Sequence, residues 1–383
     1  MRIIIAAGGT GGHLYPGLAL AREFERQVPG VEVIFVGTTR GLETKVMPRE
    51  GFELITIRAR GIMGKGGIGG LRGLAVIPLG LVQCLALCRT RRPDLVIGIG
   101  GYTSPPLVAA AFLLGIKRAL LEPNAYPGVA NRFMSPLANL VFVAFADAVP
   151  FFGTGKTQEV GTPIRRAFLE GTQSTGASRT HGSVLLILGG SQGARSINRA
   201  MCAAFPLLLQ VQPELRLIHQ TGERDFEEVA AAYRAAMQNL GSTGHSTRPP
   251  QARRDAPLPG EPEVTPFLYD MPSAMRQADL IVSRAGATTV AEITACGKPA
   301  ILIPFPHAIH GHQERNARVL EQAGAAQVIL DQQLSGDMVA QAIAALLGDR
   351  SRLARMGQQS RALGRPDSAE RVVQTCRELI RQG

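Results

Sequence analysis

The side chain best placed for proton transfer in this sequence is a histidine behind a glycine-rich turn. Residues 8–12 read GGTGG, His13 follows them directly, and a helical pattern runs over about 16–27. At a helix N-terminus the macrodipole disfavours a protonated imidazole, so His13 could serve as a neutral general base. A helix cap or another structural contact is the alternative role for this histidine.

A second candidate for chemistry lies in the C-terminal half, where residues 283–293 read SRAGATTVAEI. The pattern predicts a strand end, a turn at Gly286 and a helix that starts at Ala287. Free N–H groups at such a helix start, together with threonine hydroxyls, can bind a pyrophosphate. Glu292, one helical turn further on, could accept hydrogen bonds from two ribose hydroxyls, or it could be an ordinary solvated carboxylate.

Three of the seven histidines, His307, His310 and His312, fall in one loop. Read alone, this cluster could form a metal site. Apart from Glu314, however, no Cys, Asp or Glu with ligand spacing lies nearby, so we expect no metal. The five cysteines are scattered without a C-x-x-C spacing, which is typical of a reduced cytoplasmic protein.

The elements that must position these groups occur twice. Apolar runs at 2–7 and 183–188 each end in a glycine turn, GGTGG and GGSQG, and each is followed by a helical pattern. Further buried-strand and helix patterns alternate through both halves, as expected for parallel sheets. The sequence therefore predicts an α/β protein of two Rossmann-like domains whose parallel sheets face a central cleft. We expect residues 1–163 with a returning helix at 366–383 to form one domain, and 164–365 the other.

Two nucleotide-binding motifs are excluded by spacing. A dinucleotide fingerprint starting at Gly9 would need glycine where Leu14 stands. The stretch 153–157, GTGKT, ends like a Walker A motif, but Pro150 occupies the position of its first glycine. We therefore expect neither an oxidoreductase nor an ATP site here. The polar stretches 170–182 and 241–263 read as an interdomain linker and a flexible insertion.

The net charge of +11 and a pI near 10.0 call for an acidic partner: a nucleic acid, an anionic membrane or a phosphorylated substrate. Aromatic content of 5% and the absence of Trp weaken the nucleic-acid interpretation. Residues 58–92 hold no acid, and their apolar stretch 74–87 could be a lipid-surface anchor or a core helix with a basic end. The longest uncharged run, 73–88, is too short to span a bilayer, so we expect no transmembrane helix. The same segment carries seven cations: Arg58, Arg60, Lys65, Arg72, Arg89, Arg91 and Arg92.

Three motifs in the right order, GGTGGHLYPGLALA, GGSQGAR and SRAGATTVAEI, resemble the MurG family of bacterial glycosyltransferases. The resemblance implies the glycosyltransferase B fold and an inverting transfer of N-acetylglucosamine from UDP-N-acetylglucosamine. The acceptor would be the 4-hydroxyl of muramoyl-pentapeptide on undecaprenyl diphosphate, reached by a peripheral protein at the cytoplasmic face of the membrane, with anionic lipids as partners and no cofactor or nucleic acid. A diacylglycerol glycosyltransferase, a sugar-nucleotide epimerase and a basic nucleic-acid-binding protein remain alternatives.

The resemblance also assigns residues, with His13 as the catalytic base. Residues 121–124, Leu-Glu-Pro-Asn, depart from the family pattern because Pro123 stands where Gln usually precedes the asparagine. Acceptor binding falls to Gly100, Gly101, Tyr102, Thr103 and Asn131. Donor binding falls to Thr10, Gly11, Gly12, Asn124, Arg165, Ser191, Gln192, Phe267, Leu268, Ala287, Thr288, Thr289, Glu292, His312 and Gln313.

Overall fold

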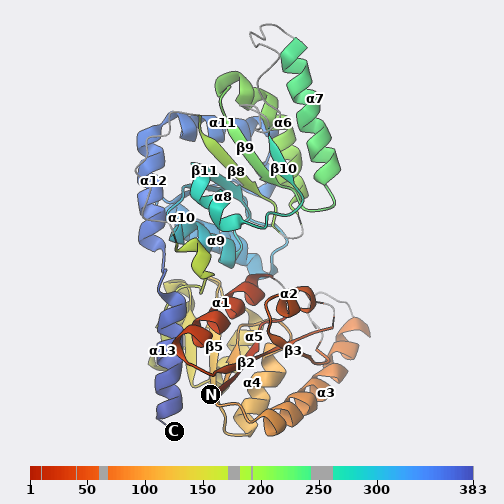
Figure 1. Cartoon of the computed structure of the whole chain (residues 1–383), viewed down its shortest axis with the longest axis vertical. Coiled ribbons are helices and arrows are strands. Elements are labelled where there is room, and N and C mark those ends of the chain that lie inside the picture. Colours follow the sequence, from red (N-terminus) through yellow and green to blue (C-terminus); the bar gives the residue numbers. More distant parts are fainter. Residues whose placement is uncertain are drawn as a thin grey trace. The chain divides into compact units, whose positions relative to one another are not determined.

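The computed structural model describes residues 1–9, 11–39, 41–59, 68–170, 182–190, 193–242 and 262–382. The chain divides into two compact units, Met1–Arg166 with Arg365–Gly383, and Ala167–Gly364 (Figure 1). The sequence predicts domain ends at 163 and 365, so the observed boundaries differ by a few residues, and Arg165 belongs to the first unit.

The first unit is built on a parallel sheet of seven strands in the order β3-β2-β1-β4-β5-β6-β7. Its central strands are continuous apolar runs because helices cover both faces; Ile3, Ile4 and Ile5 of β1 are fully buried. The strand order reverses direction between β1 and β4, which makes that point the topological switch point. The strands are β1 (Arg2–Ala6), β2 (Glu32–Gly37), β3 (Glu53–Thr56), β4 (Leu95–Gly98), β5 (Lys117–Glu122), β6 (Leu140–Val143) and β7 (Thr157–Glu159).

The helices of the first unit include the last one in the chain, which packs beside the first (Figure 1). Val372, Val373 and Cys376 of that last helix are fully buried in the same cluster as Phe24. The helices are α1 (Gly11–Gln27), α2 (Glu43–Arg49), α3 (Ile68–Arg91), α4 (Ser104–Leu113), α5 (Val129–Met134) and α13 (Ser368–Arg381). Short 3₁₀ turns are η1 (Ser135–Leu137), η2 (Ala146–Phe151) and η3 (Thr154–Lys156), and η4 (Arg166–Phe168) spans the point in the chain where the second unit begins.

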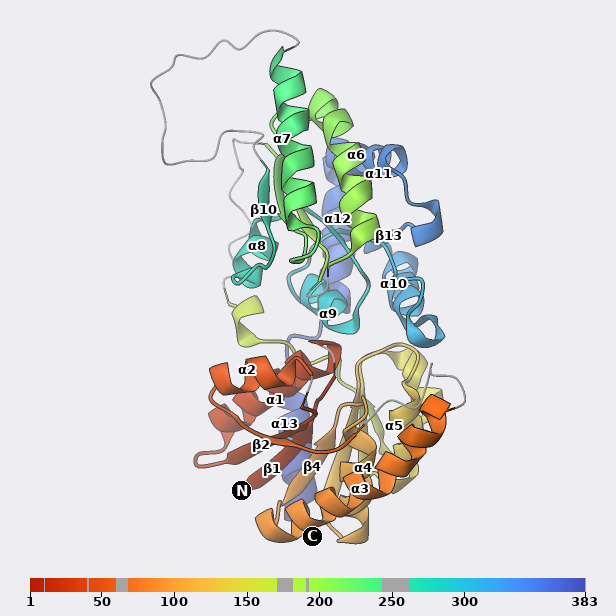
Figure 2. The ribbon, with the colours of Figure 1, turned by 90° about the vertical axis from the view of Figure 1, so that its right-hand side faces the viewer.

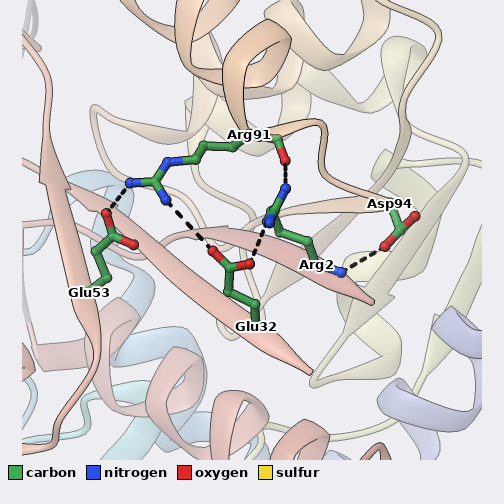
Figure 3. Close-up of polar contacts among 5 residues, drawn as sticks. All are labelled: Arg2, Glu32, Glu53, Arg91 and Asp94. Carbon is green, nitrogen blue, oxygen red and sulfur yellow. Dashed lines mark hydrogen bonds and ion pairs between the residues drawn. The ribbon is translucent and has the colours of Figure 1, made fainter. Parts of the chain in front are cut away.

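A chain of charged contacts ties the end of α3 to the amino ends of β1, β2 and β3 (Figure 3). Arg91 pairs with Glu53 and also with Glu32, whose second oxygen is 2.6 Å from Nε of Arg2. The backbone N–H of Arg2 donates to Asp94 at 2.7 Å. Because these strands run parallel, the network lies at the amino ends of the strands, opposite the glycine turns at their carboxyl ends. It holds the C-terminal end of α3 there.

The second unit repeats the plan with a parallel sheet of six strands in the order β10-β9-β8-β11-β12-β13. Its switch point lies between β8 and β11. The strands are β8 (Val184–Leu188), β9 (Arg216–Gln220), β10 (Glu263–Thr265), β11 (Leu280–Ser283), β12 (Ala300–Leu302) and β13 (Ala326–Val328). The helices are α6 (Arg195–Val211), α7 (Phe226–Ser242), α8 (Met271–Gln277), α9 (Ala287–Ala295), α10 (His312–Gln322), α11 (Gly336–Gly348) and α12 (Arg350–Leu363), with short turns η5 (Ile309–Gly311) and η6 (Asp331–Gln333).

Several elements differ from the sequence expectation. The pattern places the first helix at 16–27, whereas α1 begins at Gly11, inside the glycine turn. The polar α12 is not predicted by apolar periodicity, because only Leu353, Met356 and Ser360 are buried along it. The segment between α7 and β10 is shorter at both ends than the expected insertion 241–263, since α7 continues to Ser242 and β10 starts at Glu263. Residues 243–261 of it, like residues 171–181 of the expected linker, lie outside the described residues.

None of the described helices is both long and apolar enough to cross a membrane.

The second unit also buries a histidine inside a polar network. His219 on β9 is fully buried, with Nδ1 2.9 Å from the Tyr233 hydroxyl and Nε2 3.1 Å from Oδ1 of Asn198. Asn198 in turn donates to Thr221 O and to Asp225 Oδ2 at 3.0 and 2.8 Å. Burial lowers the pKa of His219 to about 3, because the charged imidazolium would lose its solvation.

This burial predicts a loss of stability in mild acid. The folded chain keeps His219 neutral while the unfolded chain protonates it below a pKa of about 6.5, so stability falls as the pH drops from that value towards 3. Between pH 7 and pH 5 we expect His219 to remove about 2 kcal/mol of unfolding free energy. Urea unfolding of the unaltered chain and of His219→Gln at both pH values measures this change in unfolding free energy. The variant should be less stable at pH 7 but lose less on acidification.

The matched control is His307→Gln, at an exposed histidine of the same unit. This variant should keep the pH dependence of the unaltered chain. Equal pH slopes for the unaltered chain and His219→Gln would contradict the assignment.

Candidate functional site

His13, Gly100 and Gly101 lie together at the switch point of the first unit's sheet, where the loops after β1 and β4 leave the carboxyl edge. The imidazole of His13, on the first turn of α1, lies against the backbone of the second loop. A Cβ atom built on Gly100 would be 3.1 Å from Nε2 of His13, and one built on Gly101 would be 2.5 Å from the carbonyl oxygen of Gly8. Only glycine allows the two loops to approach this closely. The structure therefore places His13 beside Gly100 and Gly101.

Asn131 reaches the same place from α5. It is 1% exposed, and its Nδ2 donates to Leu121 O and to Glu122 Oε2, both at 3.0 Å. Among the described residues, the buried Oδ1 of Asn131 and the buried Oγ1 of Thr103 have no hydrogen-bond partner. Buried polar atoms are normally satisfied, so these two acceptors suit a polar ligand. Tyr102, between Gly101 and Thr103, is half exposed.

Glu122, at the end of β5, organises this loop and was not singled out from the sequence. Its two oxygens accept from the backbone N–H and Nδ2 of Asn124, both at 3.0 Å, from Gly128 N–H at 2.9 Å, and from Asn131. Burial raises the pKa of the Glu122 carboxyl, and these hydrogen bonds oppose the shift. Asn124 is thus held firmly despite the unusual Pro123 before it. The sequence feature that could have pointed to Glu122 is a charged residue at the end of an apolar, buried strand.

A second buried carboxylate braces the first glycine turn. Glu43 on α2 accepts from Gly9 N–H at 3.1 Å and from Thr38 N–H and Oγ1 at 2.8 and 3.1 Å. It fills the space beside Gly37 and Gly41, where any Cβ would collide with it. The Gly9 N–H is consequently occupied by a protein carboxylate. Gly11 and Gly12 form the start of α1, and Thr10 lies outside the described residues.

Arg165 lies in the first unit, with its guanidinium carbon 5.0 Å from the ring centre of Tyr15. This stacking is a cation–π contact, and it fixes the arginine beside α1. The prediction that Arg165 contacts the diphosphate of a donor receives no direct support from this contact.

In the second unit, the loops after β8 and β11 leave the carboxyl edge at the switch point. Gly286 precedes α9 in an extended conformation and makes no side-chain cap, so the first turn formed by Ala287, Thr288 and Thr289 presents its N–H groups at the helix start. Glu292 is 8% exposed, which excludes the alternative of a solvated surface carboxylate. Ser191 and Gln192, after β8, lie outside the described residues.

Phe267 and Leu268 follow β10 at the same carboxyl edge. The Phe267 carbonyl accepts from the Thr265 hydroxyl at 2.9 Å, and the Phe267 ring meets that of Tyr269 edge-on, with ring centres 4.9 Å apart. Tyr269 is 80% exposed. The turn is therefore held by its own backbone while its aromatic side chains remain accessible.

The histidine loop ends in α10. His310 and Gly311 both have left-handed backbones, at φ of 53° and 64°, and His312 and Gln313 form the start of the helix. A left-handed conformation is uncommon for a non-glycine residue and is often found at functional sites. Gln313 Oε1 accepts from Phe305 N–H at 2.9 Å and so closes the loop. Within the described part of the chain, no group of three His, Cys, Asp or Glu is arranged to hold a metal ion.

Comparisons with known proteins match both units. The models of the glycosyltransferase family 28 N-terminal and C-terminal domains match residues 3–143 and 184–372. The chain is 43% identical over 376 residues to the UDP-N-acetylglucosamine–N-acetylmuramyl-(pentapeptide) pyrophosphoryl-undecaprenol N-acetylglucosamine transferase of Geobacter sulfurreducens, with 97% of each covered. It is 40% identical over 382 residues to the Myxococcus xanthus protein of the same name, covering 100% of this chain and 94% of that one.

Solved structures agree with this likeness. The crystal structure of Acinetobacter baumannii MurG superposes with a TM-score of 0.77 at 28% identity, over 98% of this chain and 99% of that one. The UDP-N-acetylglucosamine 2-epimerase of Neisseria meningitidis gives 0.67 at 14% identity, over 99% and 100%. At that low identity the epimerase shows a shared fold alone.

The contact between the two glycine loops of the first unit predicts that replacing Gly101 lowers the free energy of unfolding more than replacing a glycine with open space around it. Gly101→Ala places a methyl group against the Gly8 carbonyl, whereas Gly115, with the same φ of 70°, has nothing within 4 Å of a Cβ. Both alanine variants should lose about 1 kcal/mol for the left-handed backbone. Gly101→Ala should lose a further 1–3 kcal/mol, roughly, from overpacking. Chemical unfolding of both variants checks this difference; equal losses would show that the loops separate freely.

Proposed function

The chain belongs to glycosyltransferase family 28 and, within it, to the MurG family, and from this membership we propose its reaction. It is a glycosyltransferase of the glycosyltransferase B fold. It transfers N-acetylglucosamine from UDP-N-acetylglucosamine to the muramoyl-pentapeptide carried on undecaprenyl diphosphate, in peptidoglycan synthesis. The observation that carries this conclusion is identity of 40% and 43%, over nearly the whole chain, to relatives that bear this activity in their names. Nothing among them supports a diacylglycerol acceptor.

We propose that the second unit binds the donor. The first turn of α9, with Thr288 and Thr289, would hold the diphosphate through N–H and hydroxyl groups, without need of a metal. Glu292, buried one turn further along, would accept from the ribose hydroxyls. The uracil would lie against the backbone of Phe267 and Leu268, and His312 with Gln313 would contact the sugar hydroxyls. Ser191 and Gln192 would lie near the nucleotide-sugar.

We propose that the first unit binds the acceptor and supplies the base. The loop 100–103 and Asn131 would hold the acceptor diphosphate and sugar. The unsatisfied Thr103 hydroxyl would donate to a phosphate oxygen, and the unsatisfied Oδ1 of Asn131 would accept from a sugar hydroxyl. His13 would take the proton of the acceptor 4-hydroxyl as this oxygen attacks the anomeric carbon. The bond to UDP breaks with inversion, and Arg165 would stabilise the departing diphosphate. Asn124 and residues 10–12 would complete the donor side.

The first unit also carries an apolar surface that suits a membrane. Leu79 and Val82 of α3 are 39% and 60% exposed, and Phe112 and Leu113 of α4 are 45% and 61% exposed. The two helices pack side by side (Figure 2), and the Arg118 guanidinium lies 4.9 Å from the centre of the Phe112 ring. We propose that this surface rests peripherally on anionic lipid at the cytoplasmic face, where the acceptor's prenyl chain is anchored.

The first prediction from this proposal concerns catalysis. The chain should release UDP from UDP-N-acetylglucosamine only when the lipid-linked muramoyl-pentapeptide is present, and a chelator such as EDTA should not stop it. His13→Ala should lower kcat by about 10²–10⁴, the usual contribution of general acid–base catalysis, and leave UDP affinity unchanged. Coupled UDP detection and titration calorimetry measure the two effects. Turnover near the normal level in His13→Ala would end its assignment as the base, and UDP release without acceptor would point to a hydrolase or epimerase.

The second prediction concerns the lipid surface. Val82→Glu introduces a charge on α3, and Val211→Glu does the same on α6 of the second unit, at a valine of matching exposure (60% and 59%). Co-sedimentation with phosphatidylglycerol vesicles should fall several-fold, roughly, for Val82→Glu, because it removes apolar contact and adds repulsion. Val211→Glu should bind as the unaltered chain does. Equal binding by both variants, or salt-sensitive retention of DNA in place of vesicles, would contradict the lipid assignment.

A further inference from the structure

We propose that Asp331 is a positioning residue that sets the loop 304–313 for recognition of the donor's hexose. This inference rests on the proposed function, since it assigns a role to residues around the donor site. Asp331 starts the short turn η6, far from the motifs that mark that site in the sequence.

Asp331 closes a ring of hydrogen bonds with Arg284 and Ser196. Arg284 Nη1 donates to Asp331 Oδ1 at 2.6 Å, and Arg284 Nη2 donates to the Ser196 hydroxyl at 2.8 Å. The Ser196 hydroxyl then donates to the same Asp331 oxygen at 2.6 Å. Three segments are thereby joined at the carboxyl edge of the sheet: the start of α6, the turn after β11 and η6. Each side chain has one definite orientation in such a ring.

Arg284 passes this constraint to the histidine loop. Its Nη1 also donates to the carbonyls of Ile303 and Pro304, at 3.1 and 3.2 Å, where that loop leaves β12. Its guanidinium carbon lies 5.5 Å from the ring centre of Phe305, whose N–H is bound by Gln313. The path from Asp331 to Gln313 therefore consists of direct contacts through Arg284 and the first residues of the loop.

The charges explain why a carboxylate is needed. The side chains of Arg284 and Asp331 are only 15% and 19% exposed, so their ion pair is partly shielded from water. A guanidinium that loses its anion in such a place is poorly solvated and reorients towards another acceptor. Without Asp331, Arg284 would no longer hold the carbonyls at the base of the loop in their present direction.

The effect should be confined to the sugar. The groups assigned to uracil, ribose and diphosphate lie at Phe267 and Leu268 and on α9. Arg284 makes its loop contacts with a different segment, Ile303 to Phe305, which follows β12. The turn before α9 has a separate support, because Asn316 Nδ2 donates to Ala285 O at 3.2 Å. Binding of UDP alone therefore depends on Asp331 less than binding of the complete donor does.

The experiment compares Asp331→Asn and Ser196→Ala with Asp337→Asn, which makes the same charge change at an exposed position of the same unit. Titration calorimetry measures the Kd of UDP and of UDP-N-acetylglucosamine for each full-length variant. For the two ring variants we expect the Kd of UDP-N-acetylglucosamine to rise about five- to tenfold, the effect of one lost hydrogen bond, and the Kd of UDP to change less than about twofold. The ring variants should also discriminate less between this donor and its 4-epimer, UDP-N-acetylgalactosamine. The ratio of the two kcat/KM values measures this preference. Asp337→Asn should match the unaltered chain.

Thermal unfolding separates misfolding from mispositioning, and Ser196→Ala tests the ring without removing a charge. Equal loss of UDP and UDP-N-acetylglucosamine binding in folded ring variants would overturn the proposal, and so would no loss of either. If the unaltered chain binds the donor but does not turn over with the lipid acceptor, the proposed reaction fails while the binding comparison still decides the role of Asp331.

Discussion

The rest of the structure depends on parallel strand pairing at two switch points, β1 with β4 and β8 with β11. At each of these points two neighbouring strands send their following loops in opposite directions, which leaves room for a ligand at the carboxyl edge. The apolar strands are buried on both faces and hold this edge in place. His13 and the loop at 100–103 meet at one switch point, and the turn before α9 starts at the other. The roles proposed for the base, the loop 100–103 and the turn before α9 are therefore consequences of where these loops leave two rigid sheets.

Glycine and carboxylate have complementary roles at these edges. Gly101 allows its loop to lie directly on the Gly8 carbonyl, which brings Gly100 against the ring of His13. Glycine-rich loops have few side chains with which to pack, and buried or partly buried carboxylates hold them in place. Glu43 braces the first turn, Glu122 holds Asn124 and Asn131, and Asp331 holds Arg284. Each accepts several hydrogen bonds, which offsets the cost of taking a charge out of water.

Much of this architecture follows from the sequence alone. The two strand-turn-helix starts and the motif SRAGATTVAEI predict two α/β halves and a phosphate-binding helix start, and α9 begins at Ala287, as that motif predicts. The elements that the sequence pattern does not predict are short or polar, such as α2, α5 and α12, whose apolar faces are too small to produce a clear period. The start of α1 also differs, because glycines at a helix start give no propensity signal and tertiary contacts decide where the helix begins.

What the sequence by itself determined is the kind of protein: its repeated halves, its family motifs and the candidate residues carried by them. These depend on local patterns, in which neighbouring residues are read together. Only the tertiary structure decided which side chains support those candidates. Glu43 is 34 positions from Gly9, Asp331 is 47 from Arg284, and Ser196 is 135 from Asp331. Such partners come together because separate loops leave the same edge of a sheet, and no spacing along the chain encodes that contact.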